Sequence, residues 1–253
     1  MVKDLSVTLC GLQLANPVIP ASGTFGFGLE LASDDPSFVA GGEFVQVAID
    51  GFYLRRPLSV CERSAGRIVL IYKVVGEGTG HLATLRSGDR LDVLTGLGRG
   101  FDPNACSGSA LLVGGGVGAP PLLPLCRELV VRGKRVSVVL GFNSADEIIL
   151  EREFRALTPD VTLATVDGSA GVKGFVTDAI ASRQPAFDYF YTCGPLVMMR
   201  RVCEMLETGG EVCLEERMGC GAGYCAGCSI RTRQGTRRVC KDGPVFKKED
   251  IIW

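Results

Sequence analysis

Histidine and net charge are both scarce in this chain, and each shortage excludes a class of function. The only histidine among the 253 residues is His81, so a Rieske iron–sulfur centre, which needs two histidine ligands, is excluded. The 27 basic residues nearly balance the 28 acidic ones, which gives a formal net charge of -1. This balance offers no electrostatic attraction to nucleic acid or to an anionic membrane. We therefore expect small molecules and proteins as partners.

The sequence also lacks a secretory leader and a convincing membrane span. Eleven cysteines, an odd number with several inside apolar runs, indicate free thiols in a reducing cytoplasm. The charge-free run 103–126 is long enough to cross a bilayer, but its glycine triplet and its prolines favour a strand, a loop and a helix. We therefore predict a cytoplasmic protein without a transmembrane helix.

Four cysteines near the C-terminus carry the strongest functional signal. Cys220, Cys225 and Cys228 have the C-x4-C-x2-C spacing of plant-type [2Fe–2S] sites, and Cys240 completes a set of four ligands. The glycines between them allow a tight loop that turns backbone N–H groups toward sulfur. A structural zinc site is the alternative, although such sites usually pair two C-x2-C motifs and only one is present here. The spacing favours an iron–sulfur cluster and therefore electron transfer.

Two patterns of apolar residues divide the rest of the chain. Between residues 43 and 97, short apolar strands alternate with turns, which predicts a small β-barrel. From Ser109 onward, apolar strands alternate with helical stretches, which predicts a parallel sheet. One helix is expected over Asp146–Leu157, because Ser144 and Glu147 have the spacing of a capping box. We predict four regions: an atypical N-terminal segment over 1–40, a β-barrel over 41–105, an α/β domain over 106–210 and a cluster-binding region over 211–253.

A glycine-rich turn, Gly114-Gly115-Gly116-Val117-Gly118, joins a predicted strand to a predicted helix. A dinucleotide pyrophosphate binds at such a junction, because backbone N–H groups and the helix dipole meet it there. The acidic residue that contacts the ribose in a standard Rossmann site is absent from 137–143, so a plain tight turn remains an alternative. Two further strand ends, Asp167-Gly168-Ser169 and Cys193-Gly194-Pro195, place small polar groups where open α/β sheets bind ligands. Cys193 fits either a position beside a nicotinamide or a buried structural thiol.

With the predicted barrel, the glycine turn and the cysteine loop in this order, the chain resembles the electron-transfer subunit of class 1B dihydroorotate dehydrogenase, a ferredoxin-reductase-like family. The resemblance runs from about Glu43 to Phe246. Its most specific segments are Arg55-Arg56-Pro57-Leu58-Ser59, Ile71-Tyr72-Lys73, Gly76-Glu77-Gly78-Thr79, 114–121, 167–169, 193–195, 215–228 and 240–246.

The resemblance implies an FAD site in the barrel. It assigns Arg56, Pro57, Leu58 and Ser59 to holding FAD, Ile71, Tyr72 and Lys73 to lining it, and Gly78 and Thr79 to meeting its pyrophosphate. The chemistry of these residues is suitable, since arginine offers a planar fork of donors to phosphate and glycine permits close backbone approach. On the residues alone, Arg55 and Arg56 are more typical of solvated strand ends than of a phosphate site, and Tyr72 is more typical of a core residue.

The resemblance also implies the reaction and the partner. Electrons would pass between NAD and an FMN-containing dihydroorotate dehydrogenase catalytic subunit, through FAD and the [2Fe–2S] cluster, in pyrimidine biosynthesis. The family forms a heterotetramer with two copies of each subunit. The cofactors would carry the chemistry, so the chain needs no general acid or base and His81 receives no role.

Residues 1–40 depart from this family. Residues 5–28 instead resemble the start of the FMN-bearing catalytic subunit, whose flavin site needs a complete (β/α)8 barrel that does not follow here. Leu5–Leu9 and Leu12–Asn16 alternate around Cys10-Gly11 like a hairpin, and we expect them to replace the missing strands of the FAD barrel.

Two other functions fit part of the pattern. The first is the small flavin subunit of an NADPH–ferredoxin oxidoreductase or a sulfide dehydrogenase, whose members tend to carry aspartate where this chain has Cys220. The second is a non-catalytic interaction module stabilised by zinc, which would be colourless. The complete cysteine set favours the dihydroorotate dehydrogenase subunit over the first function, whereas a visible absorption spectrum with flavin and acid-labile sulfide quantified separates it from the second.

Overall fold

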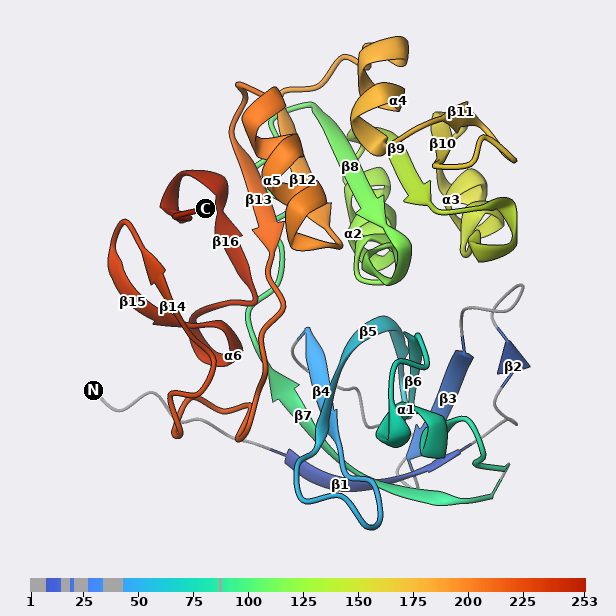
Figure 1. Ribbon diagram of the computed structural model, residues 1–253, viewed down its shortest axis with the longest axis vertical. Coiled ribbons are helices and arrows are strands. Elements are labelled where there is room, and N and C mark those ends of the chain that lie inside the picture. Colours follow the sequence, from blue (N-terminus) through green and yellow to red (C-terminus); the bar gives the residue numbers. More distant parts are fainter. Residues whose placement is uncertain (1–7, 15–18, 21–26, 34–42, 87) are drawn as a thin grey trace.

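The computed structural model describes residues 8–14, 19–20, 27–33, 43–86 and 88–253. The chain forms an antiparallel barrel, an α/β domain and a C-terminal region that lies beside both (Figure 1). No helix within the described residues is long and apolar enough to cross a membrane. The run 103–126 instead forms a loop, a strand, a short 3-10 turn and a helix, as its glycines and prolines predict.

The barrel is an antiparallel sheet in the order β1-β7-β4-β5-β6-β3-β2. Its strands are β1 (Thr8–Leu14), β2 (Ile19–Pro20), β3 (Phe27–Ser33), β4 (Phe44–Val47), β5 (Arg56–Ser64), β6 (Arg67–Tyr72) and β7 (Arg90–Leu97), and the short helix α1 (Glu77–Leu82) follows β6. β1 also pairs with β3, so the sheet returns onto itself. Val45, Val47, Leu70 and Val93 are among the buried residues that fill its interior.

The N-terminal strand differs from the hairpin expected around Cys10-Gly11. Thr8–Leu14 is one continuous strand, paired antiparallel with β7 on one side and with β3 on the other. Strand pairing on both sides requires an extended backbone, which leaves no turn at Cys10-Gly11. The flanking residues 5–7 and 15–16 lie outside the described part of the chain.

The α/β domain confirms the alternation of strands and helices. Its sheet has the order β11-β10-β9-β8-β12-β13-β16, parallel except for β16. The strands are β8 (Ser109–Gly115), β9 (Arg135–Phe142), β10 (Val161–Thr165), β11 (Val172–Lys173), β12 (Tyr189–Cys193), β13 (Gly210–Cys213) and β16 (Val245–Lys247). The helices are α2 (Leu122–Val131), α3 (Glu151–Leu157), α4 (Val176–Arg183) and α5 (Leu196–Met205), with a 3-10 turn, η1 (Gly116–Gly118), after β8.

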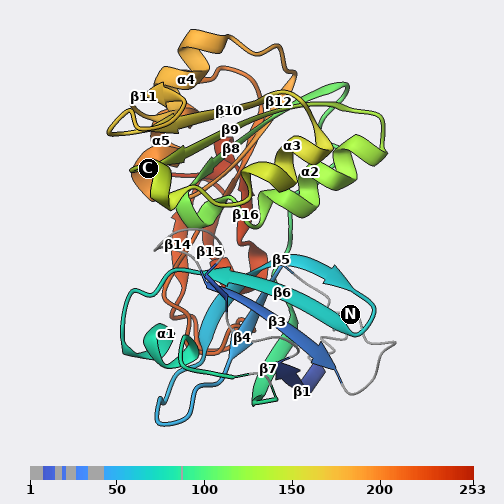
Figure 2. The same ribbon diagram turned by 90° about the vertical axis from the view of Figure 1, so that its right-hand side faces the viewer.

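Helices cover both faces of this sheet, with α2 and α3 on one side and α4 and α5 on the other (Figure 2). Alternate residues of β8 separate the two cores. Ala110 and Leu112 pack with α2 and α3, whereas Leu111 and Val113 pack with α4 and α5. Such burial on both faces explains why these strands read as continuous apolar runs.

The helix expected over Asp146–Leu157 is shorter than predicted. Ala145–Glu147 forms a 3-10 turn (η2), Leu150 adopts a left-handed conformation with φ 61°, and α3 begins only at Glu151. The Ser144 side chain makes no capping bond, and Glu147 Oε2 instead accepts a hydrogen bond from Asn143 Nδ2 at 2.8 Å. The expected helix start at Ser144 is therefore replaced by a loop that turns Ile149 into the core.

The C-terminal region contains a hairpin, β14 (Ser229–Thr232) and β15 (Gly235–Arg238), and a short helix, α6 (Val239–Asp242). A 3-10 turn, η3 (Lys248–Asp250), lies near the end of the chain. β16 pairs antiparallel with β13 and so attaches this region to the α/β sheet. The cysteine loop lies between β13 and β14, beside the barrel (Figure 1).

Candidate functional site

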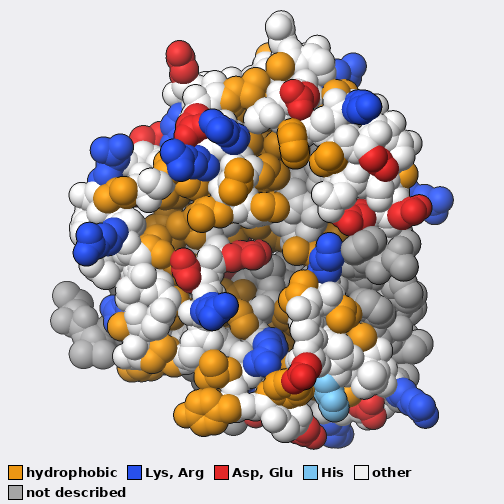
Figure 3. All heavy atoms as spheres, viewed as in Figure 1, with side chains coloured by type: hydrophobic (Ala, Val, Ile, Leu, Met, Phe, Trp, Pro, Cys, Tyr) orange, Lys and Arg blue, Asp and Glu red, His pale blue; other side chains and the backbone are white. Residues whose placement is uncertain are grey.

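The predicted cofactor residues lie where the barrel faces the α/β domain. The carboxyl-terminal ends of β8, β9 and β13 point toward the barrel (Figure 1). Ligands of open α/β sheets bind at this edge of the sheet. Figure 3 shows hydrophobic side chains gathered over a hollow in the middle of this face. Leu196 and Val197, at the start of α5, are among the exposed hydrophobic residues.

The structure brings two predicted FAD-binding segments into contact. Arg56 opens β5, and its guanidinium lies directly against Gly78 of α1, where an added Cβ would be 2.7 Å from Arg56 Nε. Arg56 also donates a hydrogen bond to Leu54 O and lies 5.0 Å from the centre of the Phe52 ring. The guanidinium is therefore held in place beside the start of α1, where it can meet a phosphate. Pro57, Leu58 and Ser59 continue β5 and are half-buried.

Thr79 has a structural role in α1. Its hydroxyl accepts hydrogen bonds from Val75 N at 2.9 Å and Gly76 N at 3.2 Å, and donates one to Gly76 O at 3.0 Å. These bonds fix the chain as it enters the helix. The sequence analysis missed this helix, since glycines at 76, 78 and 80 weaken its helical pattern.

Ile71, Tyr72 and Lys73 lie at the end of β6, where the barrel meets the α/β domain. Ile71 packs into the core that contains α2 residues, whereas Tyr72 packs inside the barrel. Burial raises the pKa of Tyr72 well above its usual value, so the phenol stays protonated. Lys73 Nζ lies 4.0 Å from Glu147 Oε1, across the two domains.

The glycine turn and the Cys193–Pro195 segment form one close backbone contact. A Cβ on Gly118 would lie 2.2 Å from Cys193 O, and one on Gly115 would lie 2.9 Å from Pro195 Cδ. Gly194 has φ 147°, and a Cβ there would lie 3.0 Å from Gly115 Cα. Only glycine permits this approach, which brings two predicted NAD-binding segments to one point of the sheet edge. Val117 is half-buried within the same turn.

Cys193 is buried in the core that contains the α2 residues. Its thiol is only 1% exposed, and it pairs with Cys213 at the matching position of the neighbouring strand. The hydrogen bond with Cys213 and burial raise the pKa of the Cys193 thiol well above its ordinary value. This arrangement favours the structural role for the thiol and leaves the backbone of residues 193–195 at the edge.

The Asp167–Ser169 loop follows β10 at the same edge. Asp167 Oδ1 accepts hydrogen bonds from Ser169 Oγ at 2.6 Å and Ser169 N at 2.9 Å, and the hydroxyl bond is the main cause that lowers the pKa of Asp167. Ser169 Oγ in turn accepts a hydrogen bond from Ala145 N at 2.7 Å. The loop is thereby joined to the turn that carries Glu147.

The cysteine loop turns backbone donors toward its sulfur atoms. Cys220 Sγ accepts hydrogen bonds from Tyr224 N at 3.2 Å and Cys225 N at 3.4 Å, and Cys225 Sγ accepts one from Gly227 N at 3.4 Å. Burial raises the pKa of Cys220, but these donors outweigh it and lower the pKa to about 6. Donors of this kind stabilise a thiolate, the form that binds metal.

The four cysteines form two pairs. Cys225 N donates a hydrogen bond to Cys220 Sγ at 3.4 Å, and Cys240 N donates one to Cys228 Sγ at 3.4 Å. Within the described part of the chain, no three His, Cys, Asp or Glu side chains converge on one ion. Two pairs of thiolates suit the two irons of a [2Fe–2S] cluster, each of which takes two cysteine ligands.

The cysteine loop packs against the outer side of β4. Phe44 of β4 belongs to the same hydrophobic core as Cys228 and Cys240. Gly221, with φ 68°, lies against the side chain of Gln46, so that an added Cβ would be 2.6 Å from Gln46 Nε2. Since β4 pairs with β5, the cluster region lies one strand away from Arg56–Ser59.

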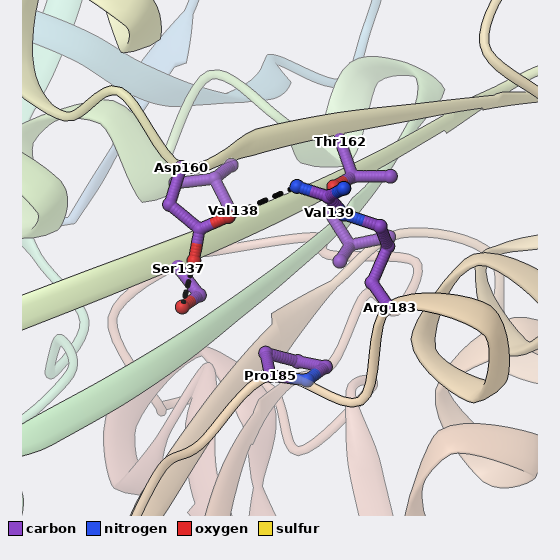
Figure 4. A pocket seen from close by; sticks show the side chains of 7 residues that line it. All are labelled: Ser137, Val138, Val139, Asp160, Thr162, Arg183 and Pro185. Atoms are coloured by element: carbon purple, nitrogen blue, oxygen red, sulfur yellow. Dashed lines mark hydrogen bonds and ion pairs between the residues drawn. The ribbon is translucent and has the colours of Figure 1, made fainter.

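Two cavities in the described part of the chain lie away from these residues. One, of about 210 Å³, lies near the start of β9 and β10 and is lined by Ser137, Asp160, Thr162 and Arg183 (Figure 4). This is the amino-terminal edge of the sheet, opposite the predicted NAD residues. The other, of about 380 Å³, lies between α2 and β5 and includes Glu43, Glu62 and Arg127.

Several residues of the site were missed by the sequence analysis. Arg55 donates hydrogen bonds to Asp92 O at 2.9 Å and to the Asp92 carboxylate, which joins the start of β5 to β7. Glu147 contacts Lys73, and Cys213 contacts Cys193. Among the missed residues, only Gln46 could have been singled out from the sequence, because it is a polar residue inside the apolar run Phe44–Val47.

Comparison with known proteins defines the class. Residues 112–204 match the family described as the oxidoreductase NAD-binding domain, and residues 215–252 match the iron–sulfur cluster binding domain of dihydroorotate dehydrogenase B. The fold of phthalate dioxygenase reductase, 19% identical, aligns with a TM-score of 0.66 over 89% of this chain and 87% of that one. The protein is a ferredoxin-reductase-like oxidoreductase with an NAD-binding domain and an iron–sulfur cluster binding domain.

Curated relatives identify the family within this class. The dihydroorotate dehydrogenase B (NAD(+)) electron transfer subunit of Fusobacterium nucleatum is 41% identical over 223 residues, 83% of this chain and 86% of that protein. The same subunit of a Geobacillus species is 44% identical over 224 residues, 84% of this chain and 87% of that protein. The chain therefore belongs to the family of dihydroorotate dehydrogenase B electron transfer subunits.

A solved structure of an NADH-dependent reduced ferredoxin–NADP oxidoreductase, studied for flavin-based electron bifurcation, is also similar. It is 30% identical, with a TM-score of 0.86 over 96% of this chain and 90% of that chain. The two families share an architecture, so their specific reactions must be separated by the residues of their sites.

Proposed function

We propose that this chain carries electrons between NAD and an FMN-containing dihydroorotate dehydrogenase catalytic subunit, through FAD and a [2Fe–2S] cluster, in pyrimidine biosynthesis. The observation that carries the proposal is the packing of the cysteine loop on β4, one strand away from the segment Arg56–Ser59. Electron carriers on neighbouring strands can exchange electrons without any movement of the protein. When bound, FAD supplies the conversion between two-electron exchange with NAD and one-electron exchange with the cluster.

The barrel residues would bind and orient FAD. Arg56, fixed against Gly78, offers its fork to the pyrophosphate, and Gly78 with Thr79 lets the backbone approach closely. Pro57, Leu58 and Ser59 would line the flavin along β5, and Ile71, Tyr72 and Lys73 would line it from the end of β6. The ion pair between Lys73 and Glu147 would keep the FAD segment beside the α/β domain.

The edge of the α/β sheet would bind NAD. Gly114–Gly118 offers backbone N–H groups to the pyrophosphate, and Asp167, Gly168 and Ser169 offer polar groups to the nucleoside. The backbone of Cys193, Gly194 and Pro195 would support the nicotinamide, with Leu196 and Val197 excluding water around it. Cys220, Cys225, Cys228 and Cys240 would ligate the cluster as two pairs.

Membership of the family supports a more specific proposal for the complex and for the pyridine nucleotide. We infer a cytoplasmic complex with two copies of this chain and two catalytic subunits, and NAD(H) as the pyridine nucleotide. Tyr224, 77% exposed in the cysteine loop, would lie near the partner, because electrons must leave the cluster at a short distance.

A second function is favoured by one observation, the 30% identity with the ferredoxin–NADP oxidoreductase over nearly the whole chain. In that case the chain would exchange electrons with ferredoxin rather than with a dihydroorotate dehydrogenase catalytic subunit. The presence of Cys220 opposes this assignment, since that family and the sulfide dehydrogenases tend to carry aspartate there.

The test mixes anaerobically purified chain with a matching catalytic subunit and follows NAD reduction by dihydroorotate. We expect coupled turnover, bound flavin, acid-labile sulfide and a paramagnetic signal from the reduced cluster. Cys225→Ser should lose the signal and the coupling while keeping flavin, and Cys203→Ser, on α5 outside the loop, should keep both. Zinc without sulfide would overturn the redox function, and ferredoxin reduction without dihydroorotate coupling would favour the second function.

A further inference from the structure

Gln46 is a polar residue in a buried position of β4. Its side chain is 0% exposed, and it lies in the sequence Phe44-Val45-Gln46-Val47. Val45 and Val47 point into the barrel core, whereas Phe44 packs with Cys228 and Cys240 on the other face of the strand. Because side chains alternate along a strand, Gln46 shares the face of Phe44, which is the face of the cluster region.

The Gln46 amide has no hydrogen bond with any part of the chain that the structure describes. Both Nε2 and Oε1 are buried and without a partner. Burial of an unpaired amide is costly, and such a group calls for a partner that the chain itself does not supply, such as a water, an ion or a bound cofactor.

The amide points to the cysteine loop. A Cβ on Gly221 would lie 2.6 Å from Gln46 Nε2, 2.8 Å from Cγ and 3.0 Å from Cδ. The glutamine thus occupies the space beside Gly221 that any larger residue would need. Gly221 directly follows the ligand Cys220, so the amide lies against the part of the loop that carries this cysteine.

The backbone of Gln46 is held by residues next to and within the segment proposed to bind FAD. Gln46 O accepts a hydrogen bond from Arg55 Nη1 at 3.4 Å, and Gln46 pairs in register with Pro57 of the segment proposed to hold FAD. This fixed backbone limits where the side chain can reach. Gln46 therefore connects the proposed flavin strand with the cluster loop.

We propose that the Gln46 side-chain amide donates a hydrogen bond to a sulfur of the [2Fe–2S] cluster on the Cys220 side and raises its reduction potential. A donor near sulfur stabilises the extra negative charge of the reduced cluster, and such bonds are a main means by which proteins adjust cluster potentials. Gln46 would contact the cluster directly, from the barrel side of the loop. The inference rests on the proposed function, because it needs the cluster to be present.

The experiment measures the midpoint potential of the cluster in the purified full chain, by redox titration followed through its paramagnetic signal. Gln46→Leu removes the donor and should shift the cluster potential to more negative values, with flavin potential and sulfide content unchanged. If the leucine variant loses its cluster, Gln46→Met is used instead, because methionine is longer and more flexible. It should also shift the cluster potential to more negative values. Thr158→Val, a buried hydroxyl removed from the α/β domain, is the matched control and should leave the potential unchanged.

An unchanged cluster potential in a Gln46 variant that keeps full sulfide content would overturn the inference. An equal shift in Thr158→Val would also overturn it, since the effect would then reflect general destabilisation. A wild-type chain with no cluster signal would instead remove the proposed function itself, so the two failures are distinguishable.

Discussion

At the residue scale, Gly78 decides how closely the Arg56 guanidinium approaches α1. The guanidinium occupies the volume that a side chain at 78 would take, with Nε at 2.7 Å and Nη2 at 2.9 Å from an added Cβ. Distances this short cannot be kept by real side chains, so one group would move. Arg56 has a flexible side chain and would be the group displaced.

We predict that Gly78→Ala weakens FAD binding about tenfold, which corresponds to about 1.4 kcal/mol, because Arg56 leaves its position beside the helix start. Gly80→Ala, in the same helix, is the matched control, since its Cβ would meet only Val74 Cγ1 at 4.0 Å. Titration of the flavin-free chain with FAD, followed by flavin fluorescence, measures both. Equal affinity in the two variants would show that Arg56 does not hold FAD.

At the element scale, β1 completes the barrel. It pairs with β7 through six residues and with β3 through three, so both neighbours would have an open edge without it. Open edges expose unpaired backbone groups and invite association between chains. The N-terminal segment, although unlike the family, therefore contributes to the shape of the predicted FAD site.

Leu12 is one of two β1 residues that pair with both neighbouring strands, with Leu91 of β7 and with Ser33 of β3. We predict that Leu12→Pro lowers the midpoint of urea unfolding and weakens FAD binding, because proline cannot donate a ladder hydrogen bond. Leu12→Val, which keeps the donor and favours strands, should behave like the parent chain. An unchanged midpoint in the proline variant would mean that β1 does not stabilise the barrel.

At the scale of the whole molecule, apolar packing joins the barrel to the α/β domain more strongly than ion pairs do. Ile71 and Cys61 of the barrel belong to the same core as Leu125 of α2. The ion pair between Arg127 and Glu62 also crosses the two domains at 2.8 Å, but its side chains are 49% and 39% exposed. Water and salt screen such a pair, so it contributes little.

We predict that Leu125→Ala lowers the free energy of unfolding by about 2–5 kcal/mol through the cavity that it leaves. Arg127→Ala, two residues along the same helix, should cost less than about 1 kcal/mol. Urea unfolding at low and high salt measures both, and only the small Arg127 effect should depend on salt. A larger loss for Arg127→Ala than for Leu125→Ala would contradict this account of the interface.

The sequence by itself determined the elements whose patterns are local. The spacing of Cys220, Cys225 and Cys228 predicted the cluster, and alternating strands and helices predicted the α/β sheet, because a ligand spacing and a hydrophobic period are properties of the chain alone. The sequence predicted a glycine-rich turn at Gly114–Gly118 and a ligand-binding strand end at Cys193–Pro195. The requirement for glycine at 115, 118 and 194 comes from the close backbone contact between these two segments, which no local pattern shows. Local patterns also failed where the surroundings decided, as at Ser144 and at Cys10-Gly11.

Only the tertiary structure decided which distant residues meet. The contact of Arg56 with Gly78, of Cys193 with Cys213, and of Gln46 with Gly221 joins residues that no local pattern connects. The sequence predicted that the N-terminal segment supplies barrel strands, but only the tertiary structure decided that it does so as one seven-residue strand paired on both sides. The physical reason is that pairing of strands and burial of polar groups depend on the partner supplied by another part of the chain.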